Sequence, residues 1–78
     1  MNKITTTIFE RAYQSYLCGG DTYTYRFESK SPLMTKKYTE AIKYLEDNEL
    51  VIVKFMSEDK VRLILTDKGI EHGNSMSV

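Results

Sequence analysis

The sequence has few of the residues that form cross-links, hold metals or catalyse reactions. Its 78 residues include one cysteine, Cys18, one histidine, His72, and no tryptophan. A single cysteine excludes an intramolecular disulfide, and one thiol with one imidazole cannot form a structural zinc site. Gly19-Gly20 is not followed by the lysine and helix of a phosphate-binding loop. We therefore expect no metal, no cofactor and no enzymatic activity.

Long hydrophobic runs are absent as well. No stretch approaches the roughly 20 apolar residues of a transmembrane helix. The N-terminal segment lacks the apolar core, roughly 7–15 residues long, of a secretory signal peptide. Because a lone thiol also suits a reducing compartment, we expect a soluble, cytoplasmic protein with no membrane partner.

Neither sign of charge is in excess. Eleven Lys and Arg residues are balanced by eleven Asp and Glu residues. Nucleic-acid-binding domains usually carry a basic excess, so this balance counts against that class unless the basic side chains gather on one surface. Aromatic rings, in contrast, are abundant, with six Tyr and three Phe. Tyrosine is common at interfaces, because its ring is apolar and its hydroxyl can form hydrogen bonds with water or with a partner.

The chain length predicts a single domain, residues 1–72, followed by a flexible tail at residues 73–78. Its first predicted helix covers residues 7–18. Thr7 and Glu10 have the spacing of a capping box, and apolar residues recur at helical spacing behind them. The two glycines that follow mark the end of this helix.

The second predicted helix follows Ser31-Pro32, an N-cap with proline at the first helical position. An apolar stripe from Met34 to Leu45 continues the helix to about Asn48, whose side chain tolerates the left-handed turn that ends helices.

Three further segments alternate as β-strands do. Residues 21–30 place three rings on one face of an extended segment: Tyr23, Tyr25 and Phe27. Residues 51–56 and 61–65 flank a turn-rich connector and predict an antiparallel hairpin. The first of these strands alternates so that one face carries Val51, Val53 and Phe55. Thr66 then caps a short last turn through Glu71.

The hairpin region resembles a known family. The stretch "YLEDNELVIV" resembles the L-E-x-x-G-L-V junction between the recognition helix and the first wing strand in regulators of the MarR and PadR type. The stretch "LTDKG" is similar to the L-T-x-x-G that closes the second wing strand in the same families. The matching residues are Leu45, Glu46, Leu50, Val51, Leu65, Thr66 and Gly69. The resemblance covers roughly residues 35–70, and in size the chain is similar to small winged-helix proteins of bacterial phages and other mobile elements.

The resemblance implies an α+β winged helix in the order helix, strand, helix, strand, strand, with the helices packed on a C-terminal antiparallel hairpin. Glu49 stands where the family has glycine. The family also has a short helix just before the recognition helix, where this sequence has alternating aromatics. Either that helix lies within residues 26–33 or the helix-turn-helix is degenerate.

The function that the resemblance implies is a DNA-binding transcriptional regulator. In a winged helix the recognition helix enters the major groove and the wing contacts the phosphate backbone. Carried onto this sequence, the candidates for contact with double-stranded DNA are Arg26, Lys30, Lys36, Lys37, Thr39, Lys43, Tyr44, Lys60 and Arg62. An isologous homodimer would suit a palindromic operator.

The residues leave alternatives open. Lysines on the second helix have acidic neighbours three or four positions away, as on an ordinary solvated helix. The same fold could instead bind a protein and modulate a host regulator. The rings of such an interface, or of a homodimer, would be Tyr13, Tyr16, Tyr23 and Tyr25, unless these form a tyrosine-rich core. Rings that alternate beside Arg26 could also stack single-stranded bases.

Overall fold

The chain folds into three helices and one three-stranded antiparallel sheet, an α+β arrangement. A computed structural model describes residues 1–76. Its elements, in chain order, are α1 (Lys3–Leu17), β1 (Tyr23–Arg26), α2 (Pro32–Asp47), β2 (Val51–Met56), β3 (Lys60–Leu65) and α3 (Asp67–Met76). The expected order of helix, strand, helix and hairpin is therefore present, and an additional helix follows the hairpin.

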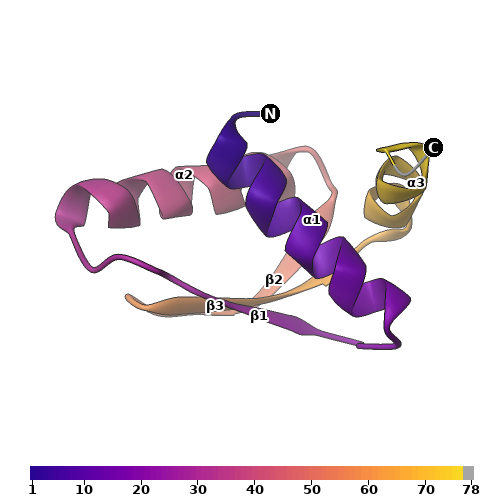
Figure 1. The fold of residues 1–78 in the computed structure, drawn as a ribbon, viewed down its shortest axis with the longest axis horizontal. Helices are drawn as coiled ribbons and strands as arrows, with labels where there is room; N and C mark the ends of the chain where they lie inside the picture. The colour runs from indigo at the N-terminus through magenta and orange to yellow at the C-terminus, as the bar shows by residue number, and fades with distance from the viewer. Residues whose placement is uncertain (77–78) are drawn as a thin grey trace.

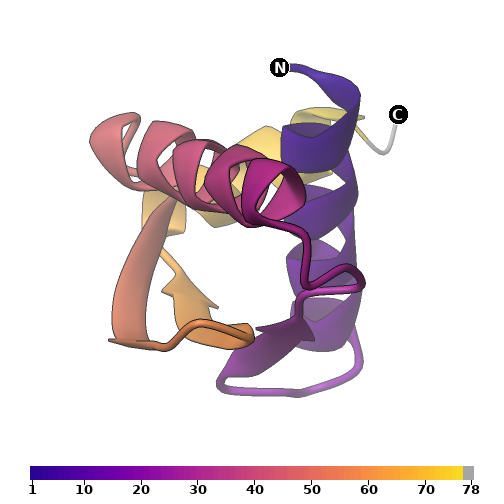
Figure 2. The same cartoon turned by 90° about the vertical axis from the view of Figure 1, so that its left-hand side faces the viewer.

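The sheet and the helices form two layers (Figure 1). β3 lies in the centre of the sheet, between β1 and β2, and is antiparallel to both. In both orthogonal views α1 and α2 lie on the same side of the sheet (Figures 1 and 2). No element of residues 1–76 covers the opposite side, which we call the outer sheet face.

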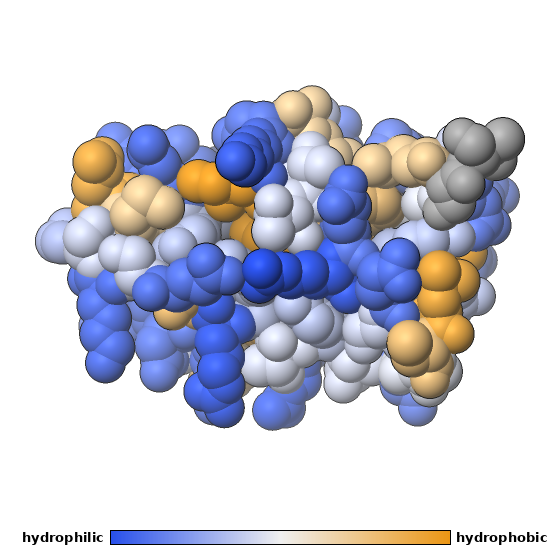
Figure 3. Space-filling view, viewed as in Figure 1, coloured by the Kyte–Doolittle hydropathy of each residue, from blue (hydrophilic) through white to orange (hydrophobic). Residues whose placement is uncertain are grey.

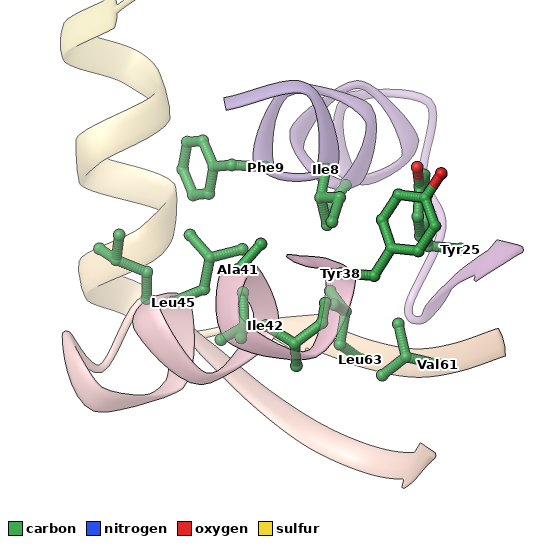
Figure 4. Close-up of a cluster of buried hydrophobic side chains, with 12 residues drawn as sticks. Ile8, Phe9, Tyr25, Tyr38, Ala41, Ile42, Leu45, Val61 and Leu63 are labelled. Carbon is green, nitrogen blue, oxygen red and sulfur yellow. The ribbon is translucent and has the colours of Figure 1, made fainter. Parts of the chain in front are cut away.

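The hydrophobic core fills the space between the two layers (Figure 4). Apolar side chains spaced three and four apart on α1 and α2 point toward the sheet, as amphipathic helices require. The largest fully buried members are Phe9, Ile8, Ile42, Leu45, Leu63 and Val61. Tyr25 of β1 lies beside Tyr38 of α2, with ring centroids 5.9 Å apart, and Phe27 stacks on Tyr38 at 4.9 Å. The predicted ring-bearing face of β1 is thus part of the core.

The first helix begins four residues earlier than its sequence pattern predicted. The side-chain oxygen of Asn2 accepts a hydrogen bond of 2.8 Å from the amide of Thr5, which makes Asn2 the N-cap. Thr5 is only 2% exposed, so the packed stripe extends to this first turn. Thr7 lies inside the helix, and its predicted capping role is wrong.

The second helix begins as predicted. The hydroxyl of Ser31 accepts a hydrogen bond of 3.1 Å from the amide of Met34, and Pro32 is the first helical residue. The segment between β1 and α2, residues 27–31, contains no helix. The first of the two alternatives, a short helix within residues 26–33 ahead of the second helix, is therefore wrong.

The end of α2 differs from the prediction in one residue. The amide of Glu49 donates a hydrogen bond of 3.0 Å to the carbonyl of Glu46, and the amide of Leu50 donates one of 3.0 Å to the carbonyl of Leu45. This is the pattern of a Schellman motif. The left-handed residue of this motif is Glu49, with φ of 61°, whereas Asn48 has φ of −87°. The prediction that Asn48 takes the left-handed turn is therefore wrong, and a glutamate occupies a conformation that glycine prefers.

A β-bulge changes the predicted alternation of β2. Val53 pairs with Leu63, but Phe55 pairs with Arg62, which leaves Lys54 as the extra residue. Beyond the bulge the inward and outward positions exchange. Phe55 is consequently 47% exposed on the outer sheet face, although its spacing predicted the same face as Val53.

The two segments that carry the family resemblance meet at one junction. The hydroxyl of Thr66 donates to the carbonyl of Glu49 and accepts a hydrogen bond of 2.9 Å from the amide of Gly69. Thr66 therefore caps α3, as predicted, and also holds the end of α2. A Cβ on Gly69 would overlap the carbonyl oxygen of Leu50. Only glycine fits where α3 crosses this turn.

The C-terminal region is helical further than expected. The predicted flexible tail began at residue 73, but residues 73–76 form the last turn of α3. This turn packs on α1, where a Cβ on Gly73 would overlap the ring of Tyr13. The Tyr13 hydroxyl donates to the side-chain oxygen of Asn74. Residues 77 and 78, the rest of the predicted tail, lie outside the described residues.

Candidate nucleic-acid interface

The face of α2 that points away from the core is polar and carries three exposed lysines and three exposed carboxylates. Its buried residues are Tyr38, Ala41, Ile42 and Leu45. Five of the candidate DNA contacts lie on exposed positions of this helix: Lys36, Lys37, Thr39, Lys43 and Tyr44. Within residues 1–76, no carboxylate oxygen lies within 4.0 Å of the ammonium group of these lysines. The acidic neighbours along the helix therefore do not form ion pairs with them.

A groove separates the start of α2 from the tip of the hairpin. It has a volume of about 970 Å³, and its lining residues are Lys30, Pro32, Thr35, Lys36, Ser57, Glu58 and Asp59. Lys30, another predicted contact, thus lies beside Lys36. The arrangement brings the helix and the wing-like hairpin together at one end of the molecule (Figure 2).

The hairpin side of this groove is acidic. The hydroxyl of Ser57 donates a hydrogen bond of 2.7 Å to the carboxylate of Asp59. This hydrogen bond lowers the pKa of Asp59 below its ordinary value, so the carboxylate stays charged at the tip. Phosphates at close range to Asp59 and Glu58 would be repelled.

The remaining three candidates lie on another surface. The side chains of β1 and β3 alternate between the core and the outer sheet face, and Arg26, Lys60 and Arg62 occupy outward positions. In the sheet, Arg26 pairs with Lys60, and Arg62 lies between Thr24 and Phe55. Because α2 covers the inner face, the core separates these three cations from the exposed face of α2. The nine predicted contacts do not form one continuous surface.

No protein-family model matches this chain, and no curated protein matches its sequence. The functional interpretation consequently depends on the side chains and their geometry.

Two of the four predicted interface tyrosines are buried. Tyr25 is 3% exposed and Tyr13 is 7% exposed. Burial raises the pKa of the Tyr25 hydroxyl above its ordinary value. Tyr23 is half-buried against the core, and only Tyr16 is well exposed, at 41%. For Tyr13 and Tyr25 the tyrosine-rich core is the arrangement observed.

The rings of β1 are also unavailable for base stacking. They face the helices, and the residues of β1 that point outward are Thr24 and Arg26. On the side of the molecule where α1 and β1 lie in front, the surface is mostly hydrophilic (Figure 3). Hydrophobic surface on this side is confined to small, separate areas (Figure 3). Leu17, the last residue of α1, is 54% exposed.

One exposed ring was missed by the sequence pattern. Phe55 points outward only because of the bulge at Lys54, and simple alternation assigned it to the core. Its exposed neighbour on β2, Ile52, was also not predicted as a surface contact. No local signal in the sequence marks the bulge.

None of the helices described in residues 1–76 is long and apolar enough to cross a membrane. In the same part of the chain, no group of three or more His, Cys, Asp or Glu side chains is placed to hold a metal ion.

Proposed function

We propose that this protein is a small winged-helix DNA-binding protein that acts as a transcriptional regulator, with α2 as the helix that enters the major groove. One observation carries the proposal: α2 exposes three lysines that form no ion pair with the described carboxylates, and it lies beside the tip of a β-hairpin. These are Lys36, Lys37 and Lys43. The helix-to-hairpin junction, held by Thr66 and Gly69, supports the same interpretation, because its residues are those of the family resemblance.

The absence of a helix before α2 affects how DNA would approach. Residues 27–31 run to α2 without forming a second helix of a helix-turn-helix. Nothing in this segment covers the first turns of α2, so Lys30 and Lys36 stay accessible. The acidic hairpin tip favours phosphates near Lys37 and Lys43 over phosphates at the mouth of the groove.

Affinity would be modest and dependent on salt. Each phosphate that a protein neutralises on duplex DNA contributes about −0.9 to the slope of log affinity against log salt. Three lysines of α2 would therefore give a slope of about −2.7. A neutral protein with so few phosphate contacts needs low salt for detectable binding.

A double charge reversal on α2 tests the proposal. Lys36→Glu with Lys37→Glu should abolish retention of duplex DNA at about 50 mM salt, while the melting temperature stays close to that of the wild type. The matched control is Lys3→Glu with Lys68→Glu, which changes the net charge equally on exposed positions of α1 and α3. The control should still bind. If wild type binds no duplex at this salt concentration, or if both variants bind alike, α2 does not read DNA.

A homodimer on a palindromic operator belongs to the same proposal. Its interface would use Tyr16, because Tyr13 and Tyr25 are buried within the monomer. The alternative of a protein-binding module is favoured by a different observation, the composition of the outer sheet face.

A further inference from the structure

The outer sheet face combines apolar side chains with positive charge and carries no carboxylate on its strands. Its outward positions are Thr24 and Arg26 on β1, Ile52 and Phe55 on β2, and Lys60, Arg62 and Ile64 on β3. Ile52 pairs with Ile64 across the two strands, and Phe55 pairs with Arg62. The result is an apolar strip flanked by three cations. Acidic side chains lie just beyond the strand ends: Asp59 directly precedes Lys60 and interacts electrostatically with Lys60 and Arg26, and Glu28 follows Arg26 by two residues.

The bulge in β2 turns Phe55 into solvent, on the same face as Ile52, which precedes the bulge and points outward without it. Fully burying a phenylalanine stabilises a protein by roughly 1.5–3 kcal/mol, yet Phe55 is 47% exposed and Ile52 is 48% exposed. Bulges commonly re-aim side chains near functional sites. The ammonium group of Lys60 lies 6.0 Å from the centroid of the Phe55 ring. A cation–π interaction at this distance helps to hold the ring in position.

Two occupants fit this surface poorly. A second copy of the chain, docked face to face, would bring Arg26, Lys60 and Arg62 against their own counterparts, and like charges at an interface oppose association. A nucleic-acid backbone would satisfy the cations but would leave Ile52 and Ile64 against phosphates and sugars. One exposed ring is also fewer than single-stranded nucleic-acid platforms use, since they stack successive bases on several aromatics.

We propose that the outer sheet face binds an acidic, amphipathic segment of another protein. Leucine-like or aromatic side chains of that segment would cover Ile52, Phe55 and Ile64. Its carboxylates would pair with Arg62 and Lys60 on the central strand β3 and with Arg26 on the edge strand β1. Each arginine can offer bidentate hydrogen bonds. A strand of six residues such as β3 spans about 20 Å, which corresponds to a helical segment of about 13 residues. This proposal goes beyond DNA binding by α2 and uses none of the α2 residues.

The experiment measures fluorescence polarisation with a labelled synthetic peptide of about 13 residues, in which leucines form one helical face and glutamates the other. Two control peptides replace every glutamate with glutamine or every leucine with serine. We expect the acidic amphipathic peptide to bind and both controls to bind at least about tenfold more weakly. Weaker binding of both controls would show that the charged and the apolar parts of the surface both contribute to peptide binding.

Variants separate this face from α2. Arg62→Glu and, independently, Phe55→Ser should weaken peptide binding by about tenfold or more, as expected for central interface residues. Lys37→Glu is the matched charge reversal on α2 and should leave peptide binding unchanged. Arg26→Glu, on the edge strand, provides a second charge reversal on the face, in case a substitution on the central strand prevents folding. Thermal melting establishes that each variant is folded.

Several outcomes would overturn the inference. It is wrong if the peptide does not bind, if folded Arg62→Glu and Arg26→Glu bind it like wild type, or if the glutamine peptide binds equally well. It is also wrong if Arg62→Glu abolishes retention of duplex or single-stranded DNA, because the face would then be a nucleic-acid surface. Failure of the α2 charge reversal to affect DNA binding, in contrast, contradicts only the proposed function.

Discussion

The strongest test of the fold is Gly69→Ala, a substitution whose expected sign is opposite to that in an ordinary helix. In a helix interior, alanine is more favourable than glycine by about 1 kcal/mol. Gly69 lies in the first turn of α3, where an added Cβ would overlap the carbonyl oxygen of Leu50 and would lie 3.3 Å from the side chain of Leu65. We therefore expect the substitution to destabilise the protein.

The magnitude follows from the contacts that must change. To admit a methyl group, the first turn of α3 must move away from Leu50, which breaks the capping hydrogen bond of Gly69 to Thr66 and the hydrogen bond of Thr66 to Glu49. Each hydrogen bond contributes about 1 kcal/mol, and overpacking adds about 1–3 kcal/mol. After subtraction of the helical preference of alanine, the net loss is about 2–4 kcal/mol. Such a loss is a large part of the roughly 4–12 kcal/mol expected for a chain of this length.

Urea denaturation and thermal melting both measure this change. At about 4–8 °C per kcal/mol for a small domain, the melting temperature should fall by roughly 8–30 °C. Lys68→Ala, at the exposed neighbouring position, is the control and should change stability by less than about 0.5 kcal/mol. A Gly69→Ala variant that melts at or above the wild-type temperature would show that α3 does not lie against Leu50 and that Thr66 does not join the end of α2 to α3.

Three further predictions concern separate elements. Glu49→Gly should stabilise the protein by about 0.5–1 kcal/mol in urea denaturation, because glycine adopts the left-handed conformation of this residue without strain; a loss of stability would contradict the Schellman ending of α2. Asn2→Ala should cost about 1 kcal/mol whereas Thr7→Ala should cost much less, and the reverse order would place the start of α1 at the capping box. Burial raises the pKa of Tyr25 above its unfolded value, so the stability it contributes is complete below about pH 10 and is lost as the pH rises through the folded pKa. Melting temperatures between about pH 8 and 11 should therefore fall more steeply for wild type than for Tyr25→Phe, and parallel curves would contradict this burial.

Local signals were sufficient for the parts of the fold that neighbouring residues control. The Ser31-Pro32 start of α2 depends on one side chain and one ring within the same turn. The hairpin and the shared face of the rings in β1 follow from alternation along single strands. Thr66 was recognised as a cap because its partner, the amide of Gly69, is three residues away.

The errors concern features that depend on distant contacts or on competing local signals. The last turn of α3 is held against α1 by the pairing of Tyr13 with Asn74, whose positions differ by 61 residues. The bulge that exposes Phe55 is defined only by the register of β2 against β3. For α1, both Asn2 and Thr7 could act as the N-cap. The burial of Thr5 in the first turn favours Asn2 as the N-cap.

The candidate site divides in the same way. The sequence alone determined which residues carry positive charge and which helix presents lysines, because helical periodicity assigns each side chain to a face. Only the tertiary structure decided that Arg26, Lys60 and Arg62 lie on the outer sheet face, apart from α2. It also decided that Tyr13 and Tyr25 are buried. The physical reason is that periodicity fixes the direction of a side chain relative to its own element, whereas packing between elements determines which of these directions meet solvent.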